Sequence, residues 1–176
     1  KEAGITVLCY GVVALPAKEE EARKVFDFAK AMGIETVVSE PARSNLEFVD
    51  KLAEEYGINV AIHNHPKPSL YWDYKVAVDA LAGRSKRLGV CADTGHWVRS
   101  GLDSVEAVKA LEGRLISFHL KDLNEAGVRD GRVGHQFLHV LLHHGHQADV
   151  DHGDQRQGDD EPCPLPRGIR RDGHGE

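Results

Sequence analysis

The sequence predicts an α/β fold built around a parallel β-sheet, and two observations predict it. Over residues 1–124, short runs rich in β-branched residues alternate with longer amphipathic segments. The alternation repeats at intervals of roughly 25 to 30 residues, the length of one strand with the helix that leads to the next strand. Tandem units of this kind form either a doubly wound sheet or an eight-stranded (β/α)₈ barrel.

The first unit begins with residues 5–13, a nearly continuous apolar run, as expected for a strand that is covered on both faces. After Pro16, apolar side chains recur at helical spacing up to Met32. Acidic residues occupy the first turn of this predicted helix and Gly33 follows its last turn, which are the usual start and stop signals of a helix.

The later units repeat this order of strand and helix. Predicted strands cover residues 35–39, 59–63, 88–92 and 115–119, and predicted helices cover residues 45–56, 74–81 and 104–111. Together with the first unit, this makes five strands and four helices in one tandem.

Composition and charge restrict the class of protein. The chain has 176 residues, 41% hydrophobic and 28% charged, so it can bury a core. A formal net charge of -6 argues against a basic nucleic-acid-binding surface and favours a small or neutral partner. No run approaches the ~18 to 20 apolar residues of a membrane span, so no membrane partner is expected. The chain begins at Lys1 without a signal peptide, so we expect the natural N-terminus upstream and a cytoplasmic protein.

The three cysteines are expected to be free thiols. Cys9, Cys91 and Cys163 lie far apart, and two of them are inside apolar runs. That placement favours buried thiols over a disulfide framework.

The last 42 residues, 135–176, differ in character from the rest of the chain. They hold seven of the eleven histidines and no lysine, and no strand or helix pattern follows Leu142. We predict two parts: a domain over residues 1–134 and a disordered, His-, Gly- and Asp-rich tail over residues 135–176, which a shifted reading frame would also produce. The histidines of this tail could bind a soft divalent metal.

Polar and ionisable residues recur where the predicted strands end. Because the carboxyl ends of parallel strands converge on one rim, residues far apart in the sequence can meet there around one ligand. Imidazole nitrogens and carboxylate oxygens bind Zn²⁺, Mn²⁺ or Co²⁺, whereas Mg²⁺ and Ca²⁺ sites use oxygen almost alone. The sequence therefore predicts a site for one of the first three cations. The residues at the strand ends are Glu40, His63, His65, Asp93, His96 and His119.

Each candidate also has an ordinary structural interpretation. His63 could be a hydrogen-bonded histidine, but the same placement at three other strands favours metal ligation. Asp93 could cap a turn or helix before Thr94, yet its position directly after an apolar strand favours a ligand. His65 precedes Pro66, which redirects the chain, so His65 is expected to line the substrate pocket.

The residues that follow these candidates have two interpretations as well. His96 is either a donor behind the ligands or a contact to substrate, and Trp97 is either a wall of the pocket or ordinary core. Lys121 and Asp122 could form a surface charge pair, but their position just past His119 places them near the same rim.

Two motifs resemble one known group of proteins. Residues 91–97, Cys-Ala-Asp-Thr-Gly-His-Trp, are similar to a strand-end Asp-Thr-x-His element, and residues 117–122, Ser-Phe-His-Leu-Lys-Asp, are similar to a His-x-Lys-Asp element. Both elements are typical of the xylose-isomerase-like (β/α)₈ barrel superfamily, which contains sugar isomerases, ketose 3-epimerases, inosose dehydratases and endonuclease IV. The resemblance covers residues 5 to 125. Since a complete barrel has about 250 residues, it implies a partial barrel, roughly strands two to six.

The resemblance implies roles for individual residues. It makes Asp93 and His119 metal ligands and places His96 at the substrate. His63 stands where many epimerases have a Glu that is both ligand and acid/base, which is closer to inosose-dehydratase-like members. The family's last ligand, a Glu, should lie beyond residue 135, where nothing resembles it. We expect the metal ligands to be His63, Asp93 and His119, the catalytic residues Glu40, His96 and Lys121, and the substrate-binding residues His65, Trp97 and Asp122.

The implied reaction is the isomerisation or epimerisation of a sugar, sugar phosphate or polyol. A divalent cation would chelate a carbonyl and its neighbouring hydroxyl, which favours an enediolate. Glu40, which could otherwise be part of a turn with Pro41, is the expected base, and His96 or Lys121 would steady the substrate oxygens.

Three alternatives stay open. Dehydration begins with the same proton transfer, so a dehydratase or lyase of inosose-dehydratase type is the first. An endonuclease IV-like phosphodiesterase is the second, and the net charge and the lack of a basic, aromatic stripe count against it. The third is a truncated, inactive barrel, or a tail that buffers metal.

Overall fold

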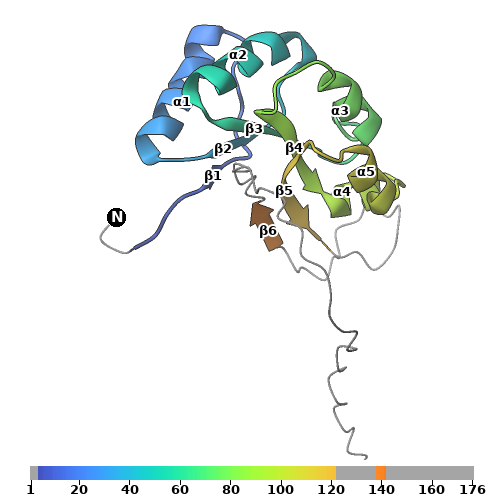
Figure 1. Ribbon diagram of the computed structural model, residues 1–176. Helices are drawn as coiled ribbons and strands as arrows, with labels where there is room; N and C mark the ends of the chain where they lie inside the picture. The colour runs from blue at the N-terminus through green and yellow to red at the C-terminus, as the bar shows by residue number, and fades with distance from the viewer. Residues whose placement is uncertain (1–3, 122–137, 142–176) are drawn as a thin grey trace, which may run out of the picture. The chain divides into compact units, whose positions relative to one another are not determined.

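The computed structural model describes residues 4–121 and 138–141, in which five parallel strands form a curled half-barrel (Figure 1). The strand order is β1-β2-β3-β4-β5-β6, and only the pairing of β5 with β6 is antiparallel among the described strands. The predicted α/β fold and partial barrel are therefore confirmed. The strands are β1 (Cys9–Tyr10), β2 (Thr36–Ser39), β3 (Asn59–His63), β4 (Leu88–Asp93), β5 (Leu115–Leu120) and β6 (Leu138–Leu141).

The four predicted helices form close to their expected positions. They are α1 (Glu19–Met32), α2 (Leu46–Tyr56), α3 (Tyr74–Ala80) and α5 (Ser104–Ala110), and a 3₁₀ turn (Arg43–Asn45) precedes α2. Gly33 ends α1 and Gly57 ends α2 in the left-handed conformation that favours glycine. One helix was not predicted, α4 (Thr94–Arg99), because six residues are too few to show helical periodicity.

The core has two layers, one on each face of the sheet. The larger cluster lies between the strands and the helices and includes Phe26, Leu52, Ile62 and Val90. The smaller cluster, of Val38, Ala61, Cys91 and Ile116, lies on the opposite face, inside the half-barrel. The residues that continue this inner face to the carboxyl ends of the strands therefore face one shared space.

The first predicted strand is an exception. Only Cys9 and Tyr10 of residues 5–13 form a strand, and Ile5, Val7 and Val12 are exposed. The expectation that this run is covered on both faces was wrong. β1 pairs with β2 alone, so within the described part of the chain its other edge has no neighbouring strand to exclude water.

An irregularity between β4 and β5 sets the side-chain register. Val90 pairs with Leu115, but Cys91 pairs with Ser117, so Ile116 is an extra residue in β5. If Ile116 instead paired with Cys91 in a regular ladder, Asp93 would pair with Phe118, which packs on the helix side. Because Ile116 stays unpaired, Asp93 pairs with His119.

Several predictions fall on other parts of the chain. β6 lies in the segment that was assigned to the tail, whereas the rest of that segment, Cys163 and Asp122 lie outside the described residues. The chain divides into Lys1–His144 and Gly145–Glu176, and the second unit also lies outside the described residues. Cys9 and Cys91 are free thiols, as expected.

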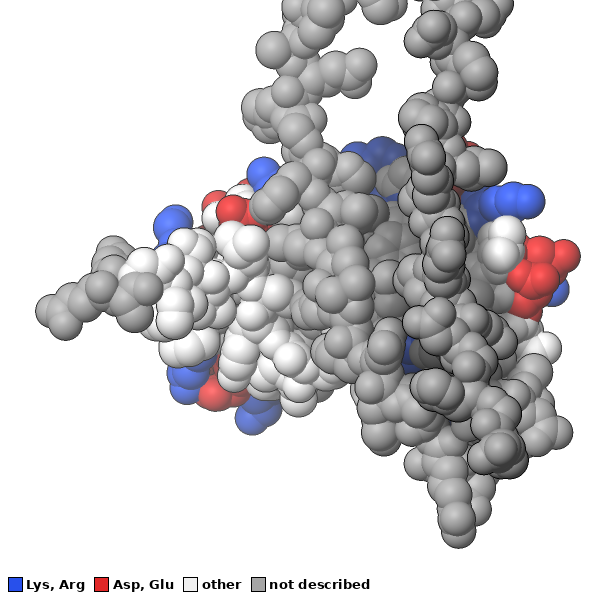
Figure 2. All heavy atoms as spheres, turned by 90° about the horizontal axis from the view of Figure 1, so that it is seen from below, with Lys and Arg blue, Asp and Glu red and all other residues white. Residues whose placement is uncertain are grey.

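The described surface has two further properties. Of the helices described, none combines the length and hydropathy needed to cross a bilayer. Figure 2 shows the molecule from below, where the visible basic groups at the rim lie beside acidic ones.

Candidate metal centre

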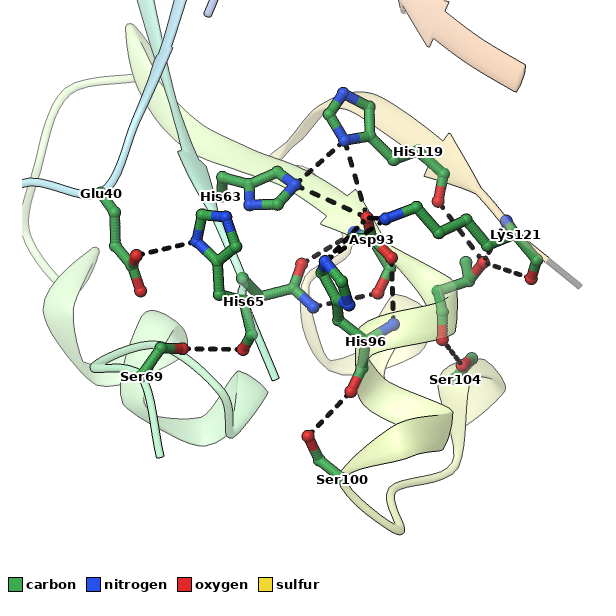
Figure 3. Close-up of polar contacts among 12 residues, drawn as sticks. Glu40, His63, His65, Ser69, Asp93, His96, Ser100, Ser104, His119 and Lys121 are labelled. Carbon is green, nitrogen blue, oxygen red and sulfur yellow. Dashed lines mark hydrogen bonds and ion pairs between the residues drawn. The ribbon is translucent and has the colours of Figure 1, made fainter. Parts of the chain in front are cut away.

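Three neighbouring strands end in side chains that meet on the inner face of the half-barrel. His63 is the last residue of β3, Asp93 is the last residue of β4, and His119 is near the end of β5. The register places His63 beside Cys91, two residues before Asp93, and it places Asp93 directly beside His119. The side chains therefore point into the same space (Figure 3).

The potential ligand atoms of these residues lie close together. His63 Nε2 is 3.0 Å from His119 Nδ1, and each of these nitrogens is 3.6 Å from Asp93 Oδ2. His96 Nε2 is 3.5 Å from the same oxygen. His63, Asp93 and His96 are all buried. Residues separated by as many as 56 positions thus present nitrogen and oxygen donors to one point.

These distances fit a divalent cation. In a tetrahedral site with bonds of about 2.0 to 2.2 Å, neighbouring ligand atoms lie about 3.3 to 3.6 Å apart. The two separations between Asp93 Oδ2 and the imidazole nitrogens match this range, and the shorter one between the two imidazoles is a hydrogen-bond distance. Asp93 Oδ2 is buried and forms no hydrogen bond of normal geometry, and its nearest charged partner is the Lys121 ammonium, so a bound cation would share this oxygen with Lys121.

Cys91 offers an alternative donor. Its Sγ groups with ligand atoms of His63 and His119, all within 4.8 Å of one another. Burial raises the pKa of the Cys91 thiol to about 12, although a contact with Ser117 opposes the shift. Since only the thiolate is a good ligand, Asp93 is the better third donor at neutral pH.

The two oxygens of Asp93 have separate contacts. Oδ1 accepts a hydrogen bond from the backbone N–H of His96 at 3.0 Å and so caps α4, while Oδ2 faces the imidazoles. Both interpretations from the sequence, cap and ligand, are therefore compatible with the geometry.

Asn64 fixes the backbone of Asp93 from the neighbouring strand. Its Nδ2 donates to the Asp93 carbonyl at 3.0 Å, and its Oδ1 accepts from the Asp93 N–H at 2.7 Å. Sequence reasoning missed Asn64, because an amide between two histidines carries no signal of this contact. We infer that Asn64 is a positioning residue, since the pair of bonds continues the β3–β4 pairing beyond its last residue.

Burial and contacts control the charge of the centre. Burial lowers the pKa of His63, and it lowers the pKa of His96 to about 4, so both imidazoles are neutral at pH 7. Burial alone would raise the pKa of the Asp93 carboxyl, but contacts with His119, His63 and Lys121 lower it below its usual value. Neutral imidazoles and an ionised carboxylate are the forms that bind metal.

Glu40 and His65 form a second pair beside the cluster. His65 Nδ1 is 2.9 Å from Glu40 Oε2, and the ring of His65 packs against His63 with centroids 4.4 Å apart. Ser69 Oγ donates to the carbonyl of His65 at 2.7 Å. The carboxylate expected to be the base is thus joined to the histidine expected to line the pocket (Figure 3).

The remaining predicted site residues have different positions. Lys121 Nζ lies 2.5 Å from Asp93 Oδ2 and 3.3 Å from His96 Nε2. Trp97 is fully buried and packs edge-on against Tyr74, which favours its interpretation as core. Asp122 lies outside the described residues.

Ionisable side chains at the carboxyl ends of curled parallel strands are the usual placement of an active site in a (β/α)₈ barrel. The chain belongs to the xylose isomerase-like TIM-barrel family, whose family model matches residues 1–157. A comparison with curated proteins found no match.

Solved structures of this architecture resemble the chain. An uncharacterised protein of Parabacteroides distasonis is 42% identical, with a TM-score of 0.57, over 68% of this chain and 48% of that protein. A D-tagatose 3-epimerase-like protein is 24% identical, with a TM-score of 0.54, over 61% of this chain and 49% of its own. The Bacillus anthracis protein described as the probable 3-DHS dehydratase AsbF of petrobactin synthesis is 15% identical, with a TM-score of 0.58, over 69% and 52%. The last two likenesses show the fold alone, and the chain spans about half the length of these relatives.

Proposed function

We propose that this chain is part of a divalent-metal-dependent enzyme that isomerises or epimerises a carbohydrate or polyol through an enediolate. The observation that carries the proposal is the convergence of His63 Nε2, Asp93 Oδ2 and His119 Nδ1 from three strands at the separations given above. Membership of the xylose isomerase-like family supports this class of reaction. The chain spans about half the length of its relatives. The activity of the whole enzyme is therefore also a proposal.

The metal ligands in this proposal are His63, Asp93 and His119, and Zn²⁺, Mn²⁺ or Co²⁺ suits them best. Such a cation supplies Lewis-acid stabilisation of the negative charge that develops on substrate oxygens. His96 Nε2 lies near Asp93 Oδ2, the oxygen that also faces His63 and His119. It is either a further metal ligand or a contact to a substrate oxygen.

The proton transfers are assigned to residues of this chain. Glu40 is the proposed base for the carbon-bound proton, and the hydrogen bond from His65 holds one of its oxygens in place. Lys121 and His96 would steady the substrate oxygens. His65 would line the substrate site together with Asp122, and Trp97 supports it from the core.

A dehydratase is the second candidate, and the donor set favours it in one respect. Among the described residues, Asp93 is the one carboxylate within ion-pair distance of His63, His96 and His119, and His63 stands where a second carboxylate would serve a symmetric epimerase. Proton return to an epimer and loss of hydroxide share the first proton transfer, so the product separates the two reactions.

An endonuclease IV-like phosphodiesterase has less support. The net charge is -6, and Figure 2 shows basic groups beside acidic ones at the left and right edges of the view from below. Binding to a nucleic acid backbone depends on clustered Lys and Arg side chains.

Metal analysis tests the proposed centre. We expect the purified chain, dialysed against Mn²⁺ or Zn²⁺, to hold one ion per chain, and the variants His63→Gln, Asp93→Asn and His119→Gln each to lose it. The matched control is His65→Gln, which removes a neighbouring imidazole outside the ligand set. Equal metal content in the parent and the three variants would contradict the proposal.

Deuterium exchange tests the chemistry. In D₂O, the chain or its full-length form should exchange a carbon-bound proton of a ketose or inosose, detected by NMR, and Glu40→Gln should abolish exchange while metal is retained. Unchanged exchange in Glu40→Gln would remove Glu40 as the base. Release of water from the substrate would assign the dehydratase reaction.

A further inference from the structure

Lys121 places an ammonium group on the carboxylate that a metal would need. Its Nζ lies 2.5 Å from Asp93 Oδ2 and 3.3 Å from His96 Nε2. The same carboxylate oxygen lies 3.6 Å from the nitrogens of both His63 and His119. The ammonium and a bound metal would therefore use one and the same oxygen atom.

The first turn of α4 has room for this lysine because residue 95 is a glycine. A Cβ atom at Gly95 would lie 2.7 Å from Lys121 Cβ and 3.2 Å from its Cδ, too close for any larger residue without a shift. The backbone N–H of Lys121 donates to Thr94 Oγ1 at 3.2 Å. These two contacts fix the base of the side chain, so that its Nζ reaches Asp93 (Figure 3).

The ammonium balances the charge of a buried group. Asp93 is completely buried, and the Lys121 ammonium lies within ion-pair distance of its Oδ2. An ionised carboxylate at this depth is costly unless a cation or several donors compensate it. Lys121 supplies a full positive charge at the oxygen that faces the imidazoles.

We propose that Lys121 is a built-in cation that neutralises Asp93 when the centre holds no metal and leaves this carboxylate when a divalent cation binds. The inference rests on the proposed metal site. Two positive centres on one oxygen atom repel each other strongly in a buried site, so Lys121 lowers the affinity for metal. Once displaced, its ammonium stays beside His96, where a substrate oxygen would be bound.

The first experiment removes the charge and keeps most of the aliphatic stem. In Mn²⁺ titrations of the full chain, we expect Lys121→Met to bind at least tenfold more tightly than the parent. Gly95→Ala, which keeps the charge but displaces the stem, should also tighten binding. The matched control is Lys51→Met, because Lys51 is an exposed lysine that pairs with Glu47. Its affinity should equal that of the parent.

Thermal unfolding gives a second readout on the same variant. With a chelator, Lys121→Met should unfold at a lower temperature than the parent, because Asp93 loses its counter-ion. With saturating Mn²⁺ this difference should disappear, since binding stabilises the folded state by an amount that grows with the logarithm of the affinity, and the variant binds more tightly.

The outcomes separate this inference from the proposed function. Equal or weaker Mn²⁺ binding by Lys121→Met than by the parent overturns the role of Lys121 and leaves the metal site standing. If neither the parent nor Lys121→Met binds Mn²⁺, the proposed site and this inference both fail.

A measurement on the unaltered chain covers the case in which Lys121→Met does not fold. Reductive methylation followed by peptide mass spectrometry reports the accessibility of each amine. Saturating Mn²⁺ should speed the methylation of Lys121 and leave Lys51 unchanged. A Lys121 rate that is equal or slower with Mn²⁺ overturns the inference.

Discussion

At the scale of single residues, Asp93 connects the architecture with the chemistry. One carboxylate oxygen caps α4 and the other faces the imidazoles and Lys121. The amide of Asn64 holds the backbone of the same residue through two hydrogen bonds. The direction of Oδ2 is therefore fixed before any ligand binds, which lowers the cost of ordering the site.

Asp93→Asn and Asp93→Ala separate these two tasks. Both variants remove the charge of a proposed direct ligand, so each should weaken metal binding by more than the roughly 10- to 100-fold that the loss of an outer-shell partner costs. Asn keeps an oxygen for the His96 amide, whereas Ala leaves that amide without its cap. Asp93→Ala should therefore be less stable than Asp93→Asn by about 0.5–2 kcal/mol in chemical denaturation. Equal stability of the two variants would contradict the capping role.

The histidines make the metal-free chain sensitive to acid. Burial lowers the pKa of His96 from 6.5 to about 4, so below pH 6.5 the unfolded chain takes up a proton that the folded chain does not. Stability should be constant with respect to this group above pH 6.5 and should fall as the pH drops toward 4, by at most about 1.4 kcal/mol per pH unit. Urea denaturation in the presence of a chelator measures the slope, which His96→Gln should reduce. A slope that is unchanged in His96→Gln would assign the acid sensitivity to other groups.

At the scale of secondary structure, the close approach of β4 and β5 depends on Gly89. A Cβ atom there would clash with the backbone oxygen of Arg114 and lie 2.7 Å from the side chain of Ile116, the extra residue of β5. That oxygen accepts the ladder hydrogen bond from Val90 N–H at 2.8 Å. We expect Gly89→Ala to cost about 1–3 kcal/mol of stability.

Metal affinity shows whether this strain reaches the centre. Gly89→Ala should also weaken metal binding, because a shift of β5 moves His119. Gly83→Ala is the control, since Gly83 has a φ of 71° and no atom within 4 Å of a Cβ. It should lose stability through backbone strain, by about 1–2 kcal/mol, and keep the metal affinity of the parent. Unaltered metal affinity in Gly89→Ala would show that the site tolerates the shift.

The sequence predicted those elements whose patterns are long or have clear ends. α1 and α2 show helical periodicity and end at Gly33 and Gly57, and β3 forms over the predicted residues 59–63. α4 is too short for a period and depends on the Asp93 cap. The strand at residues 5–13 was overestimated, because an apolar run does not reveal whether neighbouring elements cover it.

The sequence predicted which residues form the candidate site, but not the contacts between their side chains. Strand-end placement indicated that His63, Asp93 and His119 would meet, since parallel strands place their carboxyl ends together. It did not indicate the Lys121 ion pair or the hydrogen bond between His65 and Glu40, because these depend on side-chain directions. Strict alternation from Leu115, which packs toward the helices, would even have placed His119 on the helix side.

At the scale of the whole molecule, the strand-end centre and the His-rich C-terminal segment are two alternative binding sites for a metal ion. The centre lies within the unit Lys1–His144, and the unit Gly145–Glu176 contributes none of its described ligands. Deleting residues 145–176 should therefore leave one bound metal ion per chain in elemental analysis. Combining the deletion with His119→Gln should remove that ion. Loss of the ion by the deletion alone would place the metal in the C-terminal segment.

The extra residue in β5 divides that short strand into two stretches of opposite phase. Before it, Leu115 contacts the helix layer, and after it the residues of the same parity, Ser117 and His119, turn to the interior. A polar residue at position 115 would consequently disrupt the hydrophobic layer, whereas polar residues are accepted at positions 117 and 119. Selection for a firmer hydrophobic layer and selection for a new reaction could then act on adjacent positions of one strand with little interference.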